Sequence, residues 1–365
     1  MHLTLHLTDR CNLACRYCYA RHGTADMSFE TACAAIEKCA TGPDCGIVFF
    51  GGEPLLRAPL MWQIMDWCEA CRPGRFHYKV TTNGTLLDEA FLDEAVRRGL
   101  HVALSHDGAR AAHDAFRVDS AGAGTFEAVD AALARLLERR PYSPVLATVN
   151  PETADRLAES VQGLQAKGVQ YLILSMNFAG SWTDAALQTL VKEFRKLADW
   201  HEENYRKERK FYFSPFDKRI ASRVFPERSN SCRLGMRQIS VGPDGRLFPC
   251  VQFVGRAEYA IGTAVAGIDE ARREALYRCN ERDKPECAGC ALERRCHNKC
   301  GCLNLQTTGS LERIPAVLCE YERMVFPLAD RLATRLYRAR NALFLQRHYN
   351  PAFPILSFLE DLGAS

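Results

Sequence analysis

The sequence lacks the features that would direct the chain to a membrane or to a polyanion. Its N-terminal segment has no basic stretch followed by a long apolar core, so no secretory signal is recognisable, and no apolar run approaches membrane-spanning length. The 47 basic and 44 acidic residues leave a formal charge of +3, and the basic stretch at 206–210 is interrupted by Glu208. This balance does not favour a nucleic-acid partner. The sequence therefore predicts a cytoplasmic protein that binds neither nucleic acid nor membrane.

Cysteine is the residue present in excess, with 17 in 365 residues. In a short secreted chain this number would indicate disulfides, but cytosolic thiols stay reduced, and clustered cysteines there more often hold metal. Some of them fall on or beside apolar helical and strand segments and are most simply buried small residues: Cys33, Cys39, Cys45, Cys68 and Cys71. The others gather near the N-terminus and between residues 232 and 319, which predicts metal sites in those two regions.

Short apolar runs alternate with helix-period segments through the first half of the chain. Strands are expected at 2–7, 46–50, 77–82, 102–105, 145–149 and 169–175, and helices at 28–39, 59–71, 89–98, 127–139 and 154–167. This alternation predicts an α/β protein with a parallel sheet, either open and doubly wound or a partial barrel. Reactive groups in such sheets lie in the loops that follow the strands.

The composition changes after about residue 181. A polar helical region at 184–210 precedes a cysteine-rich segment at 232–319, which we expect to be short in regular structure and to begin with a hairpin turning at 241–246. Helical periodicity returns at 321–346, and an aromatic tail follows at 349–358. We therefore expect three parts: a core at 1–210, a small cysteine-rich domain at 211–325 and a C-terminal helical tail at 326–365.

Cys11, Cys15 and Cys18 follow the first expected strand directly. Three thiolates on one loop can ligate three irons of a cubane cluster and leave the fourth without a protein ligand, which suits a catalytic centre. A zinc site would need a fourth ligand, for which His22 is a weak candidate, and three unrelated buried thiols would need none. The spacing favours the iron–sulfur cluster.

This C-x3-C-x-aromatic-C pattern resembles the signature of the radical S-adenosylmethionine (SAM) superfamily. The resemblance implies a partial (βα)6 barrel in which SAM binds the open iron of a [4Fe–4S] cluster. It also implies that SAM is cleaved reductively to a 5′-deoxyadenosyl radical that abstracts hydrogen from the substrate. An external electron donor such as flavodoxin or ferredoxin would supply the electron.

Further residues match SAM-pocket positions of that superfamily. Gly51 and Gly52 resemble its glycine-rich loop, in which residues without a Cβ let backbone groups approach the methionine moiety. The resemblance also implies roles for single residues: Glu53 for the SAM ammonium group, Arg117 for its carboxylate, Ser105 for the ribose, Leu172 and the Tyr17 backbone for the adenine, and Asn83 in the pocket wall.

Seven later cysteines resemble the SPASM extension of radical SAM peptide and protein maturases, which implies two auxiliary clusters and therefore three [4Fe–4S] clusters in all. The family pattern assigns Cys287, Cys290, Cys296 and Cys319 to the distal cluster, and Cys232, Cys250 and Cys300 to the proximal one. A zinc ribbon would explain only four of the seven cysteines: Cys287, Cys290, Cys296 and Cys300. The sequence does not decide whether the fourth ligand of the proximal cluster is Cys279, Cys302 or no residue of the chain. An iron without a protein ligand could bind a substrate thiolate.

Val251 follows Cys250 at the position where relatives that oxidise a sulfatase residue carry an aspartate base. The sequence therefore favours a maturase that abstracts hydrogen from a ribosomally made peptide and installs an oxidative crosslink, either a thioether or a C–C bond. The alternatives are a dehydrogenase or epimerase acting on a small molecule, sulfatase-maturase-like protein oxidation, and a non-catalytic iron–sulfur or zinc protein. These residues do not decide between a peptide and a small molecule.

Overall fold

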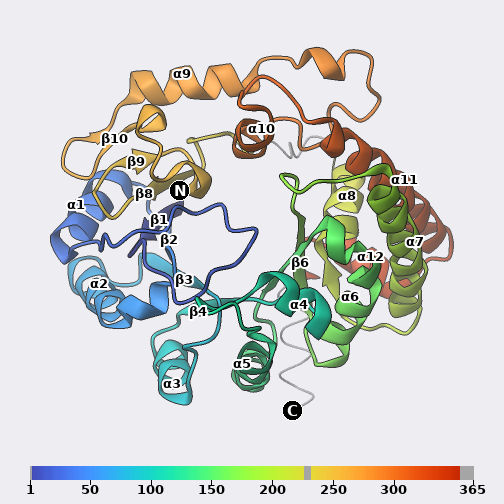
Figure 1. The fold of residues 1–365 in the computed structure, drawn as a ribbon, viewed down its shortest axis with the longest axis horizontal. Coiled ribbons are helices and arrows are strands. Elements are labelled where there is room, and N and C mark those ends of the chain that lie inside the picture. The colour runs from blue at the N-terminus through green and yellow to red at the C-terminus, as the bar shows by residue number, and fades with distance from the viewer. Residues whose placement is uncertain (1, 226–231, 354–365) are drawn as a thin grey trace.

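A curved parallel sheet forms the centre of the protein (Figure 1). The computed structural model describes residues 2–225 and 232–353. The strands lie in the order β7-β6-β5-β4-β3-β2-β1-β8-β9, where β1 to β8 run parallel and β9 pairs antiparallel with β8. Their bounds are β1 (His2–His6), β2 (Cys45–Phe50), β3 (Phe76–Thr82), β4 (His101–Ser105), β5 (Val145–Val149), β6 (Tyr171–Met176), β7 (Tyr212–Phe213), β8 (Gln238–Val241) and β9 (Leu247–Phe248).

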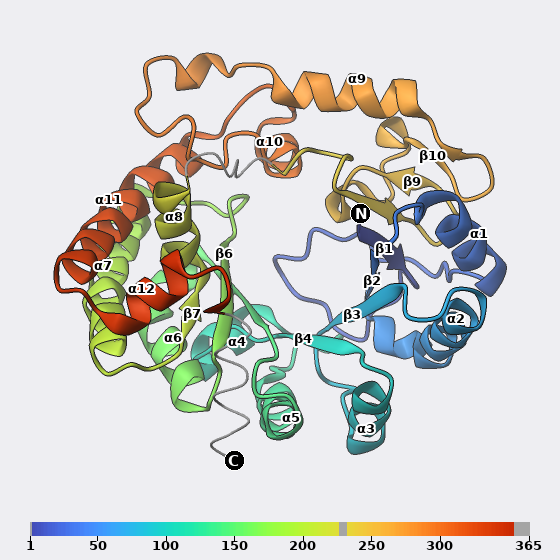
Figure 2. The same cartoon turned by 180° about the vertical axis from the view of Figure 1, so that it is seen from behind.

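Helices cover the outer side of this sheet, and Figures 1 and 2 show α1, α2, α3, α5 and α6 placed around it. The helices are α1 (Phe29–Cys39), α2 (Ala58–Cys71), α3 (Glu89–Arg97), α4 (Arg110–Phe116), α5 (Phe126–Arg139), α6 (Leu157–Ala166), α7 (Asp184–Arg206), α8 (Ser214–Val224), α9 (Glu270–Glu281), α10 (Gly301–Thr308), α11 (Ala316–Arg338) and α12 (Ala342–Tyr349). In the described residues, none of them is both long and apolar enough to cross a bilayer.

The two faces of the sheet differ in burial, as a period of two residues requires. In β2 the side chains of Ile47 and Phe49 are buried in the core, while Val48 between them is only partly covered. The same alternation runs through β3 and β5. The outer face, towards the helices, therefore holds the main apolar core, and the inner face is free to line a site.

The predicted partial barrel is confirmed, and all six predicted strands are present with ends shifted by at most two residues. The five predicted helices are present as well, and α1 starts as expected because Ser28 Oγ accepts a hydrogen bond from Thr31 N at 3.1 Å. The turn at 241–246 joins β8 to the antiparallel β9, as the hairpin prediction requires.

The cysteine-rich segment is more regular than we expected. It contains α9, whose sequence EARREALYRCNE buries only Asn280 and therefore gives almost no apolar periodicity. Figure 1 shows α9 and α10 running from the β8–β9 end of the sheet towards α8 and α11. The short elements β7 and α4 were also not predicted. Residues 354–365 of the expected tail lie outside the described residues.

One buried carboxylate joins the C-terminal helices to the sheet. Asp217 on α8 accepts hydrogen bonds from Tyr205 Oη at 2.9 Å and from Phe213 N at 2.6 Å, and Arg347 and His348 of α12 each lie 3.5 Å from it. Burial alone would raise the pKa of Asp217, but the neighbouring histidines and Arg347 hold it well below its usual range. Asp217 is therefore charged and compensated.

We expect Asp217→Ala to lower the free energy of unfolding by about 3–5 kcal/mol, because it leaves the buried partners without their common charge. Denaturant unfolding monitored by circular dichroism would measure this loss. Asp199→Ala is the matched control, because that side chain on α7 is 81% exposed. Equal effects of the two substitutions would contradict the structural role of Asp217.

Candidate functional site

Two backbones meet at the start of the N-terminal cysteine loop, which we define as residues 8–18. Gly52 N donates to Thr8 O, and Glu53 N donates to Arg10 O, both at 2.8 Å. A Cβ on Gly52 would lie 2.1 Å from Arg10 O, and one on Gly51, whose φ is +141°, would lie 2.5 Å from Thr8 O. No side chain fits at these distances. The glycines therefore hold the cysteine loop, a role that the sequence analysis did not assign to them.

The other end of the cysteine loop is held by the last residue of α4 and the segment that follows it. Ala14 N donates to Val118 O at 2.8 Å, and Arg16 N donates to Phe116 O at 2.9 Å. Cys11 lies between these anchors, Cys15 lies within the second and Cys18 lies two residues beyond it, and the three thiols are near enough to affect one another electrostatically. The structure thus brings the predicted triad together on a loop that is fixed at both ends.

Glu53 lies beside the triad and is almost completely buried. Its Oε1 accepts hydrogen bonds from Thr82 Oγ1 at 2.8 Å and Leu55 N at 3.0 Å, and its Oε2 accepts one from Asn83 N at 2.8 Å. A carboxylate offers about four lone-pair sites, so one on Oε2 stays available for a ligand ammonium group. Burial raises the pKa of Glu53 to about 7, against the effect of these hydrogen bonds.

Asp107, at the end of β4, organises a second part of the site. It accepts two hydrogen bonds from Arg117, at 2.9 and 3.1 Å, and one from Tyr17 Oη at 2.7 Å. It also accepts one from Thr148 N at 2.8 Å. Burial would lower the pKa of Arg117, but Asp107 raises it well above its usual range. Arg117 therefore stays charged, with its Nε and one terminal nitrogen bound to Asp107.

The structure brings most of the remaining predicted SAM contacts to the inner side of the site. Asn83 Nδ2 donates to Asn12 Oδ1 at 2.9 Å and lies 3.9 Å from Cys11 Sγ, so Asn83 supports the cysteine loop. Ser105 pairs in register with Leu146, which pairs with Ile173, and these three residues share the inner face.

Leu172 is not brought to this face. It pairs with Val145 on the outer face and lines a small cavity together with residues of α6 such as Val161 and Leu164. Its position therefore does not support the expected adenine contact. Its neighbour Ile173 occupies the inner face of β6, and the sequence could not distinguish these two apolar residues.

The distal set of cysteines gathers as the resemblance implies. Cys287, Cys290, Cys296 and Cys319 lie near enough to affect one another electrostatically, and Asn298 Nδ2 approaches Cys287 Sγ at 3.4 Å. Arg295 fixes the loop before Cys296 through two hydrogen bonds to Asp330 of α11, at 2.8 and 2.9 Å.

The three proximal cysteines also lie close together, and a fourth cysteine lies with them. Cys232, Cys250 and Cys300 are neighbours, and Cys302 lies among them with its Sγ 3.4 Å from Cys300 Sγ. The other candidate, Cys279, lies instead beside Arg282 and Lys284.

The thiol environments fit iron–sulfur clusters. Backbone N–H groups point at the sulfurs of cysteines in all three sets, including Leu13 N to Cys11, Gly301 N to Cys232 and Asn298 N to Cys296. Such hydrogen bonds stabilise the thiolates that ligate a cluster. Within the described ranges no three His, Cys, Asp or Glu side chains surround a point for a single ion. A cubane cluster binds each cysteine at a separate iron, so its ligands need not surround one point.

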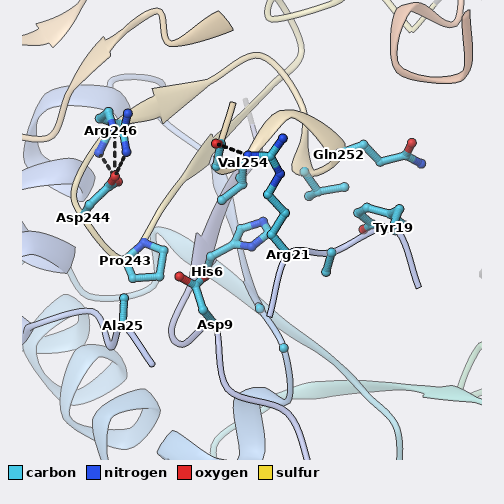
Figure 3. A pocket seen from close by; sticks show the side chains of 15 residues that line it. His6, Asp9, Tyr19, Arg21, Ala25, Pro243, Asp244, Arg246, Gln252 and Val254 are labelled. Atoms are coloured by element: carbon cyan, nitrogen blue, oxygen red, sulfur yellow. Dashed lines mark hydrogen bonds and ion pairs between the residues drawn. The ribbon is translucent and has the colours of Figure 1, made fainter. Parts of the chain in front are cut away.

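A cavity of about 150 Å³ lies between the cysteine loop and the C-terminal region (Figure 3). Asp9, Tyr19 and Arg21 line it from one side, and the other side contains Val251 and Gln252 from the segment after Cys250. His6, at the end of β1, also lines it, and within the described part of the chain its buried Nε2 has no hydrogen-bond partner. Burial lowers the pKa of His6 to about 3, so its imidazole is neutral.

Replacing Cys11, Cys15 and Cys18 together by Ala should remove about four irons, one cubane, from anaerobically reconstituted protein that binds roughly twelve. SAM cleavage should be lost at the same time. Iron analysis and release of 5′-deoxyadenosine would measure both. The control is Cys33→Ala with Cys71→Ala, which should keep all the iron. Zinc in place of iron in protein purified without oxygen would contradict the cluster assignment.

Comparisons with known proteins agree with this geometry. The model of the radical SAM superfamily matches residues 5–164. A probable GTP 3′,8-cyclase from Methanocella arvoryzae is 31% identical over 265 residues, 68% of this chain and 80% of that protein. The serine-type anaerobic sulfatase-maturating enzyme of Klebsiella aerogenes is 24% identical over 319 residues, 80% of this chain and 76% of that protein.

The solved structure of native anSMEcpe with bound AdoMet and a peptide has a TM-score of 0.80 at 21% identity, covering 93% of this chain and 99% of that one. The likeness in fold therefore extends through the cysteine-rich C-terminal region. Because the residues matched by the family model include the three-cysteine loop and the strands that hold it, this chain belongs to the radical SAM superfamily.

Proposed function

We propose that the protein is a peptide maturase that abstracts hydrogen from a ribosomally made peptide and installs an oxidative thioether or C–C crosslink. The observation that carries the proposal is the cavity beside the cysteine loop, whose far wall comes from the segment after Cys250. The lining contains Tyr19, which follows Cys18 in the sequence, and Val251, which follows Cys250, so a substrate in this cavity would lie near both sets of cysteines. This arrangement suits a reaction in which hydrogen is lost on one side and an electron is accepted on the other.

The cluster and SAM, when bound, supply a carbon radical that abstracts hydrogen. The residues of the chain would bind SAM and the substrate and orient them. In this proposal Oε2 of Glu53 receives the SAM ammonium group, the glycine-rich loop holds the cysteine loop in place, and Ser105 lies on the inner face for the ribose. Asp107 fixes Arg117 and Tyr17, so that both approach the ligand from a rigid position.

Sulfatase-maturase-like oxidation is the second candidate, because the enzyme from Klebsiella aerogenes matches most of this chain. The position where such relatives carry the aspartate base is Val251, and it lines the cavity here. A valine cannot accept a proton there. This wall residue favours crosslinking over formation of an aldehyde.

The products would distinguish the two candidates. With reductant and SAM, a short peptide encoded beside this chain should lose two hydrogens per crosslink, and tandem mass spectrometry should find no cleavage between the joined residues. The product should not react with a hydrazide. A hydrazide-reactive peptide would favour aldehyde formation, and 5′-deoxyadenosine formed only with a sugar or alcohol would favour the small-molecule dehydrogenase.

Glu53→Gln should weaken SAM binding by a factor on the order of tenfold to a hundredfold, because it removes a charge-assisted contact of about 1.5–3 kcal/mol. Equilibrium dialysis against labelled SAM would measure the change, with the cluster absorbance as a check on integrity. In the unchanged protein, affinity should fall roughly tenfold from pH 8 to pH 6 as the carboxyl takes up its proton. The variant should not show this additional pH dependence.

Thr82→Val is the matched control for Glu53→Gln. It removes the hydroxyl that donates to Glu53 and keeps the carboxylate. It should therefore retain most of the SAM affinity. Equal losses in the two variants would show that Glu53 acts only by holding the loop.

A further inference from the structure

Cys302 occupies the first turn of α10, directly among the proximal cysteines. Its Sγ lies 3.4 Å from Cys300 Sγ, and its thiol is also close to that of Cys250. Cys232 reaches the same place from another segment, with its Sγ 3.6 Å from Lys299 O and the Gly301 N–H directed at it. Four thiols from three separate segments thus converge on residues 299–302.

The loop that presents this pair of cysteines is built for close contact. Asn280, which is completely buried, donates from Nδ2 to Lys299 O at 2.9 Å. A Cβ on Gly301 would lie 2.5 Å from Asn280 Oδ1 and 3.0 Å from a methyl group of Leu234. Only glycine fits between the two cysteines, so the backbone of the Cys-Gly-Cys sequence is fixed against α9.

The environment of Cys302 is also that of a cluster site. Cys250 and Leu305 belong to a small apolar cluster against which both Cys279 and Cys302 pack, and of these two Cys302 is the one whose Sγ contacts Cys300 Sγ. Backbone N–H groups of Val251 and Gln252 point at Cys250, and those of Cys302 and Leu303 point at Cys300. Such donors compensate the charge of ligating sulfurs inside an apolar shell.

We propose that Cys302 is the fourth protein ligand of the proximal auxiliary cluster. It takes the place of the cysteine that some relatives carry a few residues after the first ligand, where this chain has no cysteine at 233–238. Each of the four thiols releases its proton when it binds iron. The two sulfurs now in contact separate onto different irons by rotation about a side-chain bond. No iron is then left for a substrate thiolate.

The inference rests on the cluster content of the proposed function but not on the peptide substrate. The full-length chain with Cys11, Cys15 and Cys18 replaced by Ala isolates the auxiliary clusters, because it removes the cluster that is open to SAM. After anaerobic reconstitution and reduction, potassium cyanide is added and the electron paramagnetic resonance spectrum is recorded. Cyanide binds an iron that lacks a protein ligand, so the spectrum should stay unchanged.

Adding Cys302→Ala to this background should either lower the iron content by about four, one cubane, or create a cluster whose spectrum cyanide alters. Cys302→Ser should shift the spectrum before cyanide is added, because an oxygen replaces a sulfur, and it serves if the Ala variant does not fold. Cys279→Ala is the matched control and should change neither quantity.

Two results would overturn the inference while leaving the proximal cluster in place. One is a cyanide effect already present in the background protein, and the other is a Cys302→Ala variant with unchanged iron and spectrum although Cys250→Ala loses about four irons. If Cys250→Ala also keeps all its iron, the cluster assignment within the proposed function fails as well.

Discussion

The N-terminal site depends on the close approach of two backbones, that of Gly51–Gly52 and that of residues 8–10. A Cβ on Gly52 would lie 2.1 Å from Arg10 O, so this contact exists only because both loop residues are glycines. The contact fixes residues 8–10 and therefore the position of Cys11, which follows them. Glu53, the next residue, donates from its backbone N to Arg10 O, and its carboxylate accepts hydrogen bonds from Thr82 and Asn83, so this residue joins the cysteine loop to the end of β3. The site is therefore rigid before any ligand binds.

Much of the fold could be predicted because the two faces of the sheet differ so clearly in burial. The sequence of β3 alternates apolar and polar residues with a period of two, that of β2 is a short apolar run, and the amphipathic helices between strands give a period of 3.6. The helix α9 escaped prediction because it buries only Asn280, and β7 because it has two residues. Periodicity also does not say which face of β6 is inside. Leu172 and Ile173 are both apolar, and only the register with β5 separates them.

Part of the candidate site could likewise be predicted from the sequence, and part of it could not. The cysteine spacing predicted candidate ligands that are close in sequence, because a short loop keeps them close in space. Asp107 escaped because its partners Tyr17, Arg117 and Thr148 are far from it in the sequence and near it only after β1, β4 and β5 align. The choice between Cys279 and Cys302 likewise needed the tertiary structure. Both pack against the apolar cluster that contains Cys250, but Cys279 of α9 is near Arg282 and Lys284, whereas the Sγ of Cys302 lies 3.4 Å from that of Cys300.

Closure of the proximal cluster by Cys302 separates two tasks that an open iron would combine. An open iron could lower the pKa of a substrate thiol, hold its sulfur and accept an electron at one place. A closed cluster can accept the electron but cannot position the nucleophile, so positioning falls to the cavity wall. That wall contains the neutral His6 imidazole, whose Nε2 has no partner among the residues that the structure describes, and Arg21, whose guanidinium donates to Gly255 O at 3.4 Å (Figure 3). The bond that forms would then be selected by the shape and polarity of this cavity, and the same core could join carbon to carbon as readily as sulfur to carbon.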